Sequence, residues 1–284
     1  MTIELRRPQP EHIAELGRIC YEAFKDIAES HGFPPDFDSV EFAQGVVGLL
    51  MQQESVYTTA AFERDAPRGS NFMNMWGDAA GIGPISVDLS TQGEGIGKRL
   101  MQDALDHAKQ HGIASVRLCQ DSFNMRSLAL YASLGFDVKE PLAYMTLSSA
   151  GHVDDAFRPA TPADYDAMDA LCRDVYRISR KGEYATLIAV GFPAFVLDRG
   201  GRITGYVIGT AIGHGVAQSD DDMLALLAGI GATTPDAHAH IAMRQGTLYR
   251  RALAAGHRNR KVMNLMTYGP YEEPQGTYCP SVMF

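Results

Sequence analysis

The chain has 284 residues, of which 45% are hydrophobic and 21% charged, an ordinary composition for a folded globular protein. At roughly 100–200 residues per domain, this length favours two domains over one. The formal net charge of −9 argues against a nucleic-acid partner, because an acidic surface repels phosphate backbones.

The N-terminus and the four cysteines indicate the compartment. Residues 1–7 lack the apolar core of a signal peptide, and no apolar run approaches the ~20 residues that span a bilayer. The cysteines form no C-x-x-C pair, so neither a zinc nor a redox motif is indicated. We therefore expect a cytoplasmic protein with reduced thiols, no membrane partner and no metal.

Strands and helices alternate along the first half. Apolar residues recur at helical spacing from Ile13 to Ile27, which predicts an amphipathic helix beginning at Pro10. Gly135 is placed to end a later helix in the left-handed conformation. We expect further helices at about 39–52, 95–110 and 124–134, a turn at 65–69, and strands at 5–7, 55–62, 71–76, 82–89, 115–119 and 137–147.

The pattern then restarts. Arg7-Pro8 recurs as Arg158-Pro159, and Gly135 precedes Met145 by the same spacing with which Gly256 precedes Met266. Such self-similarity indicates an internal duplication with a shortened second copy. The small, polar stretch 148–151 is the expected linker. We therefore predict a first domain over residues 1–148 and a second over 154–284.

A glycine-rich turn follows the predicted strand at 82–89 and opens the long helix at 95–110. Backbone N–H groups in such a turn point outward, and a helix N-terminus carries partial positive charge, so the turn predicts an anion site. Glycine also lets a bulky pyrophosphate approach the backbone closely. The turn reads Gln92-Gly93-Glu94-Gly95-Ile96-Gly97-Lys98.

Two common phosphate motifs fail at this turn. The G-x-x-x-x-G-K-[ST] loop needs a glycine where Gln92 stands and a hydroxyl where Arg99 stands. The dinucleotide fingerprint G-x-G-x-x-G needs a glycine in place of Lys98. A third pattern, Q/R-x-x-G-x-G/A after a strand, fits throughout.

A second motif stands downstream and reads Asn124-Met125-Arg126-Ser127-Leu128-Ala129-Leu130-Tyr131-Ala132-Ser133-Leu134-Gly135-Phe136. In this order, the two motifs resemble those of the GNAT superfamily of N-acetyltransferases. They lie within residues 81–136, and the element order extends the resemblance over 1–148. The resemblance implies an α+β fold of two GNAT-like domains, the second degenerate, each a mixed, mostly antiparallel twisted sheet flanked by helices.

The resemblance also implies roles around acetyl-CoA as co-substrate. Tyr131 would be the catalytic acid that protonates the departing thiolate. A backbone N–H near Val87 would stabilise the oxyanion. The implied coenzyme-binding residues are Ile85, Ser86 and Val87 along the pantetheine arm, Gln92, Gly93, Glu94, Gly95, Ile96, Gly97 and Lys98 around the pyrophosphate, and Asn124 with Ser127 at the pantetheine or phosphate region.

The proton acceptor stays open. An amine near pKa 10 is mostly ammonium at neutral pH, so it must lose a proton before it attacks. Many GNAT members carry a glutamate on the strand before the glycine turn, but residues 81–87 contain no carboxylate. The alternatives are Asp78, Asp88, Asp121, the Phe284 carboxylate and ordered water.

The second half lacks a counterpart of the glycine turn. Strand-like runs are expected at 194–197 and 203–208, and Ser219 or Asp220 is expected to cap a helix over 222–228. The aspartates at 220–222 would repel pyrophosphate, so we expect no second coenzyme site. We expect this half to shape the acceptor pocket, and the alternatives are a purely structural role and dimerisation. The basic stretches 177–181 and 258–261 are expected to be solvated. His238 and His240 share a strand face without a third metal ligand.

We therefore predict an N-acetyltransferase that moves an acetyl group from acetyl-CoA to a small-molecule primary amine by direct attack in a ternary complex. Two alternatives stay open: an acyl-CoA sensor without turnover, motivated by the missing strand carboxylate, and acetylation of a protein N-terminus or lysine. The sequence decides neither the acceptor, the acyl length nor whether the chain forms a homodimer.

Overall fold

The computed structural model describes residues 2–209 and 213–283. The chain divides into two compact units. The first comprises 1–75, 79–116 and 123–137, and the second comprises 76–78, 117–122 and 138–284. Each unit combines helices with mostly antiparallel strands, which confirms the expected α+β class. The boundaries expected along the sequence, 1–148 and 154–284, stay a prediction about domain organisation.

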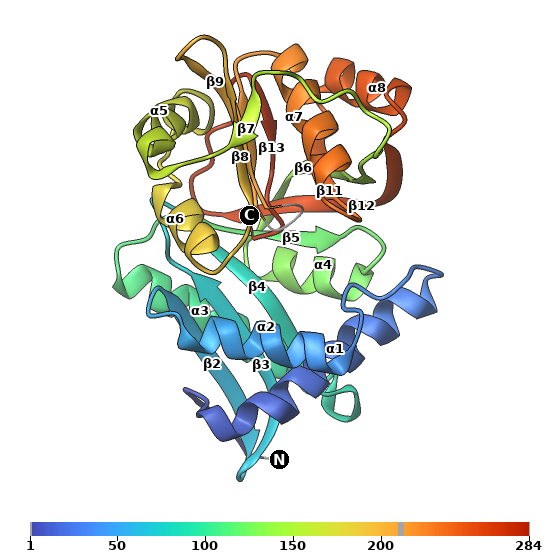
Figure 1. Cartoon of the computed structure of the whole chain (residues 1–284). Coiled ribbons are helices and arrows are strands. Elements are labelled where there is room, and N and C mark those ends of the chain that lie inside the picture. The colour runs from blue at the N-terminus through green and yellow to red at the C-terminus, as the bar shows by residue number, and fades with distance from the viewer. Residues whose placement is uncertain (1, 210–212, 284) are drawn as a thin grey trace. The chain divides into compact units, whose positions relative to one another are not determined.

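The first unit contains a sheet with the strand order β1-β2-β3-β4, in which all neighbours are antiparallel. Figure 1 shows α1 and α2 on one face and α3 on the other. The elements are β1 (Ile3–Arg6), η1 (Pro10–His12), α1 (Ile13–Ser30), α2 (Val40–Gln52), β2 (Val56–Glu63), β3 (Ala66–Asn74), β4 (Ala80–Val87), η2 (Leu89–Thr91), α3 (Ile96–Gln110) and α4 (Met125–Ser133).

Alternation along β4 decides which side chains reach α3. Ile85 and Val87 pack with the cluster that contains Ile96 and Leu100 of α3. Ser86, one residue out of phase, lies on the opposite face of the strand, where α1 packs. The end of β4 is thereby attached to the first turns of α3, and the connection between them is the glycine-rich turn.

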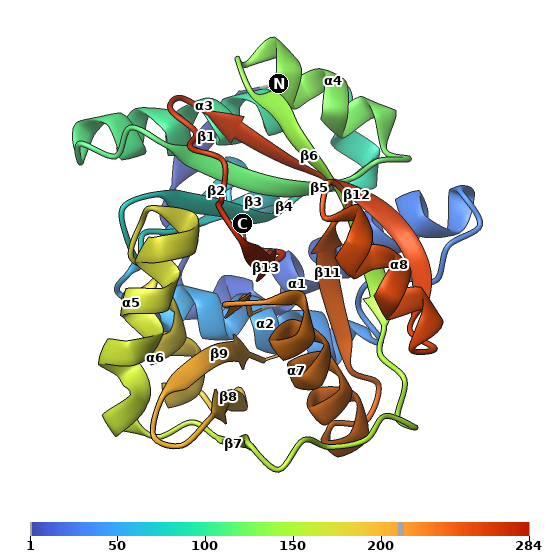
Figure 2. The same cartoon turned by 90° about the horizontal axis from the view of Figure 1, so that it is seen from above.

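The second unit contains two runs of paired strands, ordered β5-β12-β6-β11 and β13-β10-β9-β8-β7. Figure 2 shows β12 alongside β6 and β5. The elements are β5 (Val116–Asp121, with Val116 grouped in the first unit), β6 (Asp137–Thr146, with Asp137 likewise), β7 (Phe157–Pro159), η3 (Pro162–Asp164), α5 (Tyr165–Tyr176), α6 (Lys181–Ala189), β8 (Ala194–Asp198), β9 (Ile203–Ile208), β10 (Gly215–Ala217), α7 (Asp220–Thr233), β11 (His238–Ala242), α8 (Gly246–Ala254), β12 (Arg258–Tyr268) and β13 (Thr277–Cys279).

Strand β12, near the end of the chain, lies between β5 and β6, which come from the predicted first domain. Side chains support this insertion. Lys261 Nζ forms an ion pair with Asp121 Oδ1 at 2.8 Å, and Asn264 Nδ2 donates to Gln120 Oε1 at 3.0 Å. The Ser122 N–H donates to the Val262 carbonyl at 3.1 Å. Strand β12 therefore supplies one backbone neighbour to each of β5 and β6.

In the sheet β13-β10-β9-β8-β7, successive side chains of a strand belong to two different hydrophobic clusters. Tyr206 belongs to the cluster that contains α5 and α6, and Val207 to the cluster that contains α7. The same division separates Tyr278 from Cys279 on β13. The period of two along each strand thus buries both faces, one under α5 and α6 and the other under α7.

The two halves of the sequence repeat local structure. Each begins with strand, 3₁₀ turn and helix, and in each the third residue of the turn accepts from the preceding cap N–H: Gln9 N to His12 Nδ1 at 2.9 Å, and Thr161 N to Asp164 Oδ2 at 2.7 Å. The helices α4 and α8 both end before a glycine of positive φ, Gly135 at 94° and Gly256 at 88°. This agrees with the expected duplication.

Most expected elements are present with shifts of a few residues, but the turn at 65–69 was wrong. Only Arg64 and Asp65 form it, with Arg64 at φ 57°, and β3 begins at Ala66. The register of β3 against β4 starts at Gly69, so Pro67 occupies an edge where its missing N–H costs nothing. Strand β3 ends at Asn74, short of the expected Trp76.

The two basic stretches are not wholly solvated, which corrects that expectation. Arg180 is 1% exposed, and its Nε donates to Glu183 Oε2 at 2.6 Å. Glu183 in turn contacts His214 Nδ1 at 3.0 Å, so the guanidinium belongs to a buried network. Lys261 is also buried, beside Asp121. In the described residues, no helix is both long and apolar enough to cross a membrane.

We predict that a chain truncated after residue 148 will not fold, because it loses β12 from between β5 and β6. The truncated chain should aggregate or elute as an expanded species and show no cooperative thermal transition. Supplying residues 149–284 on a second chain should restore a cooperative transition. A truncated chain that is monomeric and unfolds cooperatively would show that β12 is dispensable.

Candidate functional site

The glycine turn reverses the chain between β4 and α3 by means of two left-handed residues. Gly93 has φ 88° and Gly95 has φ 82°, and Gly95 is the N-cap of α3. Both are exposed, and a Cβ added at either would meet no atom within 4 Å. The backbone of the turn therefore faces open space, and its conformation is one that L side chains rarely adopt.

The start of α3 presents amides toward that open side. The first helical hydrogen bond runs from Arg99 N–H to the Gly95 carbonyl at 3.1 Å. The N–H groups of Ile96, Gly97 and Lys98 precede it and so carry no helical acceptor. Aligned amides with the helix dipole behind them attract anions. Binding of an anion at these amides stays a prediction.

The side chain of Gln92 links the turn to its surroundings. Its Nε2 donates to the Val87 carbonyl at 3.2 Å, and its Oε1 accepts from Arg126 on α4. Gln92 therefore joins the end of β4, the turn and the start of α4. The sequence analysis singled out Gln92 but missed Arg126, although Arg126 stands inside the quoted motif. An exposed arginine beside a cap residue carries no sequence signal of its contact.

Asn124 and Ser127, the polar positions of the second motif, form local contacts at the start of α4. Asn124 is the N-cap of α4, and its Oδ1 accepts from the Ser127 N–H at 3.1 Å. The Ser127 hydroxyl donates to the Asn124 carbonyl at 3.0 Å. These contacts satisfy amides that a helix start leaves without acceptors. A role of either residue toward coenzyme stays a prediction.

Tyr131 is the one buried side chain among the nine residues of α4, all of which the structure describes. It is 7% exposed, and its ring lies 6.1 Å from that of Phe136. Burial raises the pKa of its hydroxyl well above the usual value, because the phenolate would lose hydration. The hydroxyl therefore stays protonated at neutral and mildly alkaline pH.

The three aspartates considered as proton acceptors are all engaged. Asp88 caps η2, accepting from Ser90 N at 2.9 Å. Burial alone would raise its pKa, but the Ser90 hydrogen bonds and nearby arginines outweigh burial and lower it. Asp78 Oδ2 accepts from Ser179 N at 2.9 Å, and Asp121 pairs with Lys261. The Phe284 carboxylate lies outside the described residues.

The positions of the second half that correspond to the glycine turn and to Tyr131 carry different residues. Helix α7 is capped by Ser219, as expected, and starts at Asp220, two residues before the expected start. Its three aspartates are engaged: Asp220 accepts from Thr277, Asp221 pairs with Arg251, and Asp222 pairs with Arg199. Counted back from the glycines that end α4 and α8, Tyr131 corresponds to Ala252. This half therefore lacks both the glycine turn and the tyrosine.

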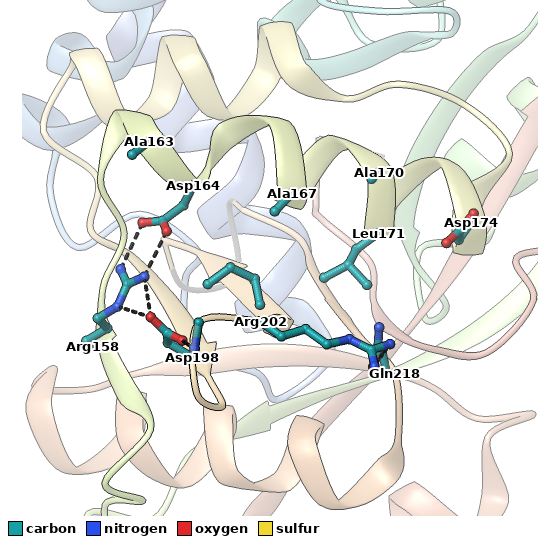
Figure 3. A pocket seen from close by; sticks show the side chains of 12 residues that line it. Arg158, Ala163, Asp164, Ala167, Ala170, Leu171, Asp174, Asp198, Arg202 and Gln218 are labelled. Carbon is teal, nitrogen blue, oxygen red and sulfur yellow. Dashed lines mark hydrogen bonds and ion pairs between the residues drawn. The ribbon is translucent and has the colours of Figure 1, made fainter.

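A surface cavity of about 430 Å³ lies in the second unit. At one end Arg158 joins Asp164 at 2.8 Å and Asp198 at 2.9 Å (Figure 3). This ion-pair cluster ties the start of the unit to the β8–β9 turn. None of the predicted site residues lines this cavity, which is bounded by Arg158, Ala163, Asp164, Ala167, Ala170, Leu171, Asp174, Asp198, Gly201, Arg202, Ile203 and Gln218.

Comparisons with known proteins agree with these features. Residues 15–136 match the model of the Acetyltransferase (GNAT) family. The mycothiol acetyltransferase of Kocuria rhizophila is 38% identical over 64 residues, which are 22% of this chain and 21% of that protein. The chain thus spans about a fifth of that curated relative in the match.

Solved structures show the same fold over nearly the whole chain. A candidate acetyltransferase from Pyrococcus horikoshii has a TM-score of 0.79 at 15% identity, covering 97% of this chain and 92% of that one. A GCN5-related N-acetyltransferase from Sphaerobacter thermophilus has a TM-score of 0.62 at 16% identity, covering 97% and 98%. These likenesses extend the fold beyond the residues that the family model matches.

We predict that alanine is more destabilising at one glycine of the turn than at another. Gly95→Ala should lower the free energy of unfolding by roughly 1–2 kcal/mol, because a Cβ disfavours φ 82°. Gly97→Ala should change it by less than about 1 kcal/mol, because this helical position gains propensity while its Cβ lies 3.4 Å from Leu130 Cδ2. Urea denaturation measures both, and equal losses would contradict the assigned backbone conformation.

Proposed function

We propose that this chain, a member of the acetyltransferase (GNAT) family, transfers the acetyl group of acetyl-CoA to the primary amine of a small molecule by direct attack in a ternary complex. The observation that carries the proposal is the exposed turn at 93–95, whose two left-handed glycines lead into the N-terminus of α3. The family uses acetyl-CoA, whose thioester supplies the activated acetyl group.

The turn fits the pyrophosphate of the coenzyme. The amides of Ile96, Gly97 and Lys98 have no acceptor within the helix, and the absence of side chains at Gly93 and Gly95 lets a bulky diphosphate approach. The segment Ile85 to Val87 would run beside the pantetheine arm, and a backbone N–H near Val87 would hold the thioester oxygen as negative charge develops there. Asn124 and Ser127, which cap α4, complete the proposed coenzyme-binding set.

Tyr131 has the properties of the proposed acid. The amine nitrogen bonds to the acetyl carbon, the carbon–sulfur bond breaks, and the sulfur takes a proton from the Tyr131 hydroxyl. Burial raises the pKa of Tyr131, so the hydroxyl carries its proton when the thiolate leaves. Water would carry the excess proton of the attacking amine to the Tyr131 phenolate, since Asp78, Asp88 and Asp121 are held by other groups.

Coenzyme A release in the presence of acetyl-CoA and a panel of small primary amines tests the function. We expect turnover with at least one amine and the acetylated amine as product by mass spectrometry. Calorimetric binding of coenzyme A without turnover on any amine would favour the sensor, and turnover only on peptides would favour protein acetylation. A chain that does not bind coenzyme A at all would end the proposal.

We predict that Tyr131→Phe lowers kcat on the order of 10²-fold while the KM for acetyl-CoA stays within about threefold, because the acid acts only as the thiolate leaves. Tyr57→Phe, whose lost hydroxyl donates to Asp103 at 2.7 Å, serves as the matched control and should keep normal kcat. An unchanged kcat in Tyr131→Phe would assign this tyrosine to packing alone.

The pH dependence provides a separate check. Activity should rise with pH as more of the acceptor amine loses its proton. Because burial raises the pKa of Tyr131, the acid should stay protonated, and no descending limb should appear below about pH 10. A fall in kcat that begins near pH 8 and persists in Tyr131→Phe would show that another group limits turnover.

A further inference from the structure

Arg126 has an arrangement that the proposed pyrophosphate contacts do not explain. It is exposed on the first turn of α4, and one of its guanidinium nitrogens donates to Gln92 Oε1. Gln92 is itself anchored, because its Nε2 donates to the Val87 carbonyl at 3.2 Å. The guanidinium is therefore held at the rim of the amide turn by a chain of two hydrogen bonds.

Arg126 has guanidinium N–H donors that take no part in its contact with Gln92. A guanidinium offers five N–H donors in a plane, and in the described part of the chain no carboxylate pairs with Arg126. Arg99, another arginine close to the turn in sequence, differs in this respect, because its guanidinium donates to the Ile3 carbonyl of β1 at 2.8 Å. Arg126 is thus an oriented cation at the turn that lacks an anionic partner of its own.

The chemistry of coenzyme A supplies such a partner. Besides the pyrophosphate, the molecule carries a phosphomonoester on its ribose, which is close to doubly charged at neutral pH. A pyrophosphate held by the amides of 93–98 would place the ribose next to the rim of the turn, within the reach of an arginine side chain. A guanidinium binds such a phosphate through two parallel N–H···O bonds.

We propose that Arg126 binds the ribose 3′-phosphate of the acyl-CoA and that Gln92 positions Arg126 for this contact. The inference rests on the proposed function, since it requires the pyrophosphate to lie in the turn. It assigns to Arg126 a preference for coenzyme A over the same molecule without that phosphate. The amides of the turn bind a group that both molecules share and so confer no such preference.

Calorimetry with coenzyme A and with dephospho-coenzyme A tests the assignment. The wild-type chain should bind coenzyme A more tightly, on the order of tenfold, the size expected for hydrogen bonds to a charged group. In Arg126→Gln the affinity for coenzyme A should fall by about that factor, and the affinity for dephospho-coenzyme A should stay within about twofold. Gln92→Leu, which removes the anchor, should reduce the preference without abolishing it.

Matched variants separate this contact from its neighbours. Arg99→Gln removes an exposed guanidinium that is tied to Ile3 and should leave the preference unchanged. Lys98→Gln, on the turn itself, should weaken both ligands by the same factor.

Equal losses for both ligands in Arg126→Gln would place Arg126 on the pyrophosphate and overturn the inference. The inference would also be overturned if the wild-type chain preferred coenzyme A over dephospho-coenzyme A by less than about twofold. It would be overturned as well if this preference were lost in Lys98→Gln and kept in Arg126→Gln. If wild-type chain binds neither ligand, the proposed function itself has failed.

Discussion

The left-handed conformation of Gly93 and Gly95 is the constraint on which the candidate site depends. With φ angles of 88° and 82°, these residues turn the chain from β4 into α3 within a few residues. An L side chain at such an angle costs roughly 1–2 kcal/mol, which glycine avoids. The reversal keeps the first turn of α3 packed against the end of β4, and the proposed diphosphate contacts depend on that arrangement.

In a site built from backbone, the main-chain amides and the surrounding side chains have different roles. In the proposed site, the amides of 96–98 would supply donors whose direction is set by the helix, and the side chains around them would add contacts of their own. Gln92 is central to this, because it contacts both Val87 and Arg126. Side chains at the rim can therefore alter ligand preference while the backbone site is preserved.

The two halves show how a common frame can carry different chemistry. Both begin with the same strand, 3₁₀ turn and helix, and both end a nine-residue helix at a left-handed glycine. They differ at caps and at single side chains, with Ser219 where the first half has Gly95, and Ala252 where it has Tyr131. Caps are local, so the second half could lose an anion site and retain its packing. Its aspartates at the start of α7 are paired instead with cations and a hydroxyl.

Short-range signals in the sequence predicted the element order, the glycine turn, the cap at Ser219 and the internal repeat. These features depend on residues a few positions apart, so their physics is visible in a single stretch of chain. Pro67 shows the limit of such signals, because a proline that indicates a turn is also tolerated on the edge of a strand.

Only the tertiary structure decided which distant segments meet. The insertion of β12 between β5 and β6, the contact of Glu183 with His214, and the contact of Arg126 with Gln92 join residues whose partners no local pattern specifies. The sequence around a charged side chain does not show that a carboxylate of another element pairs with it. The sequence of a strand likewise does not specify which strand lies beside it. The physical reason is that strand pairing and ion pairing reward proximity in space, which the folded chain alone creates.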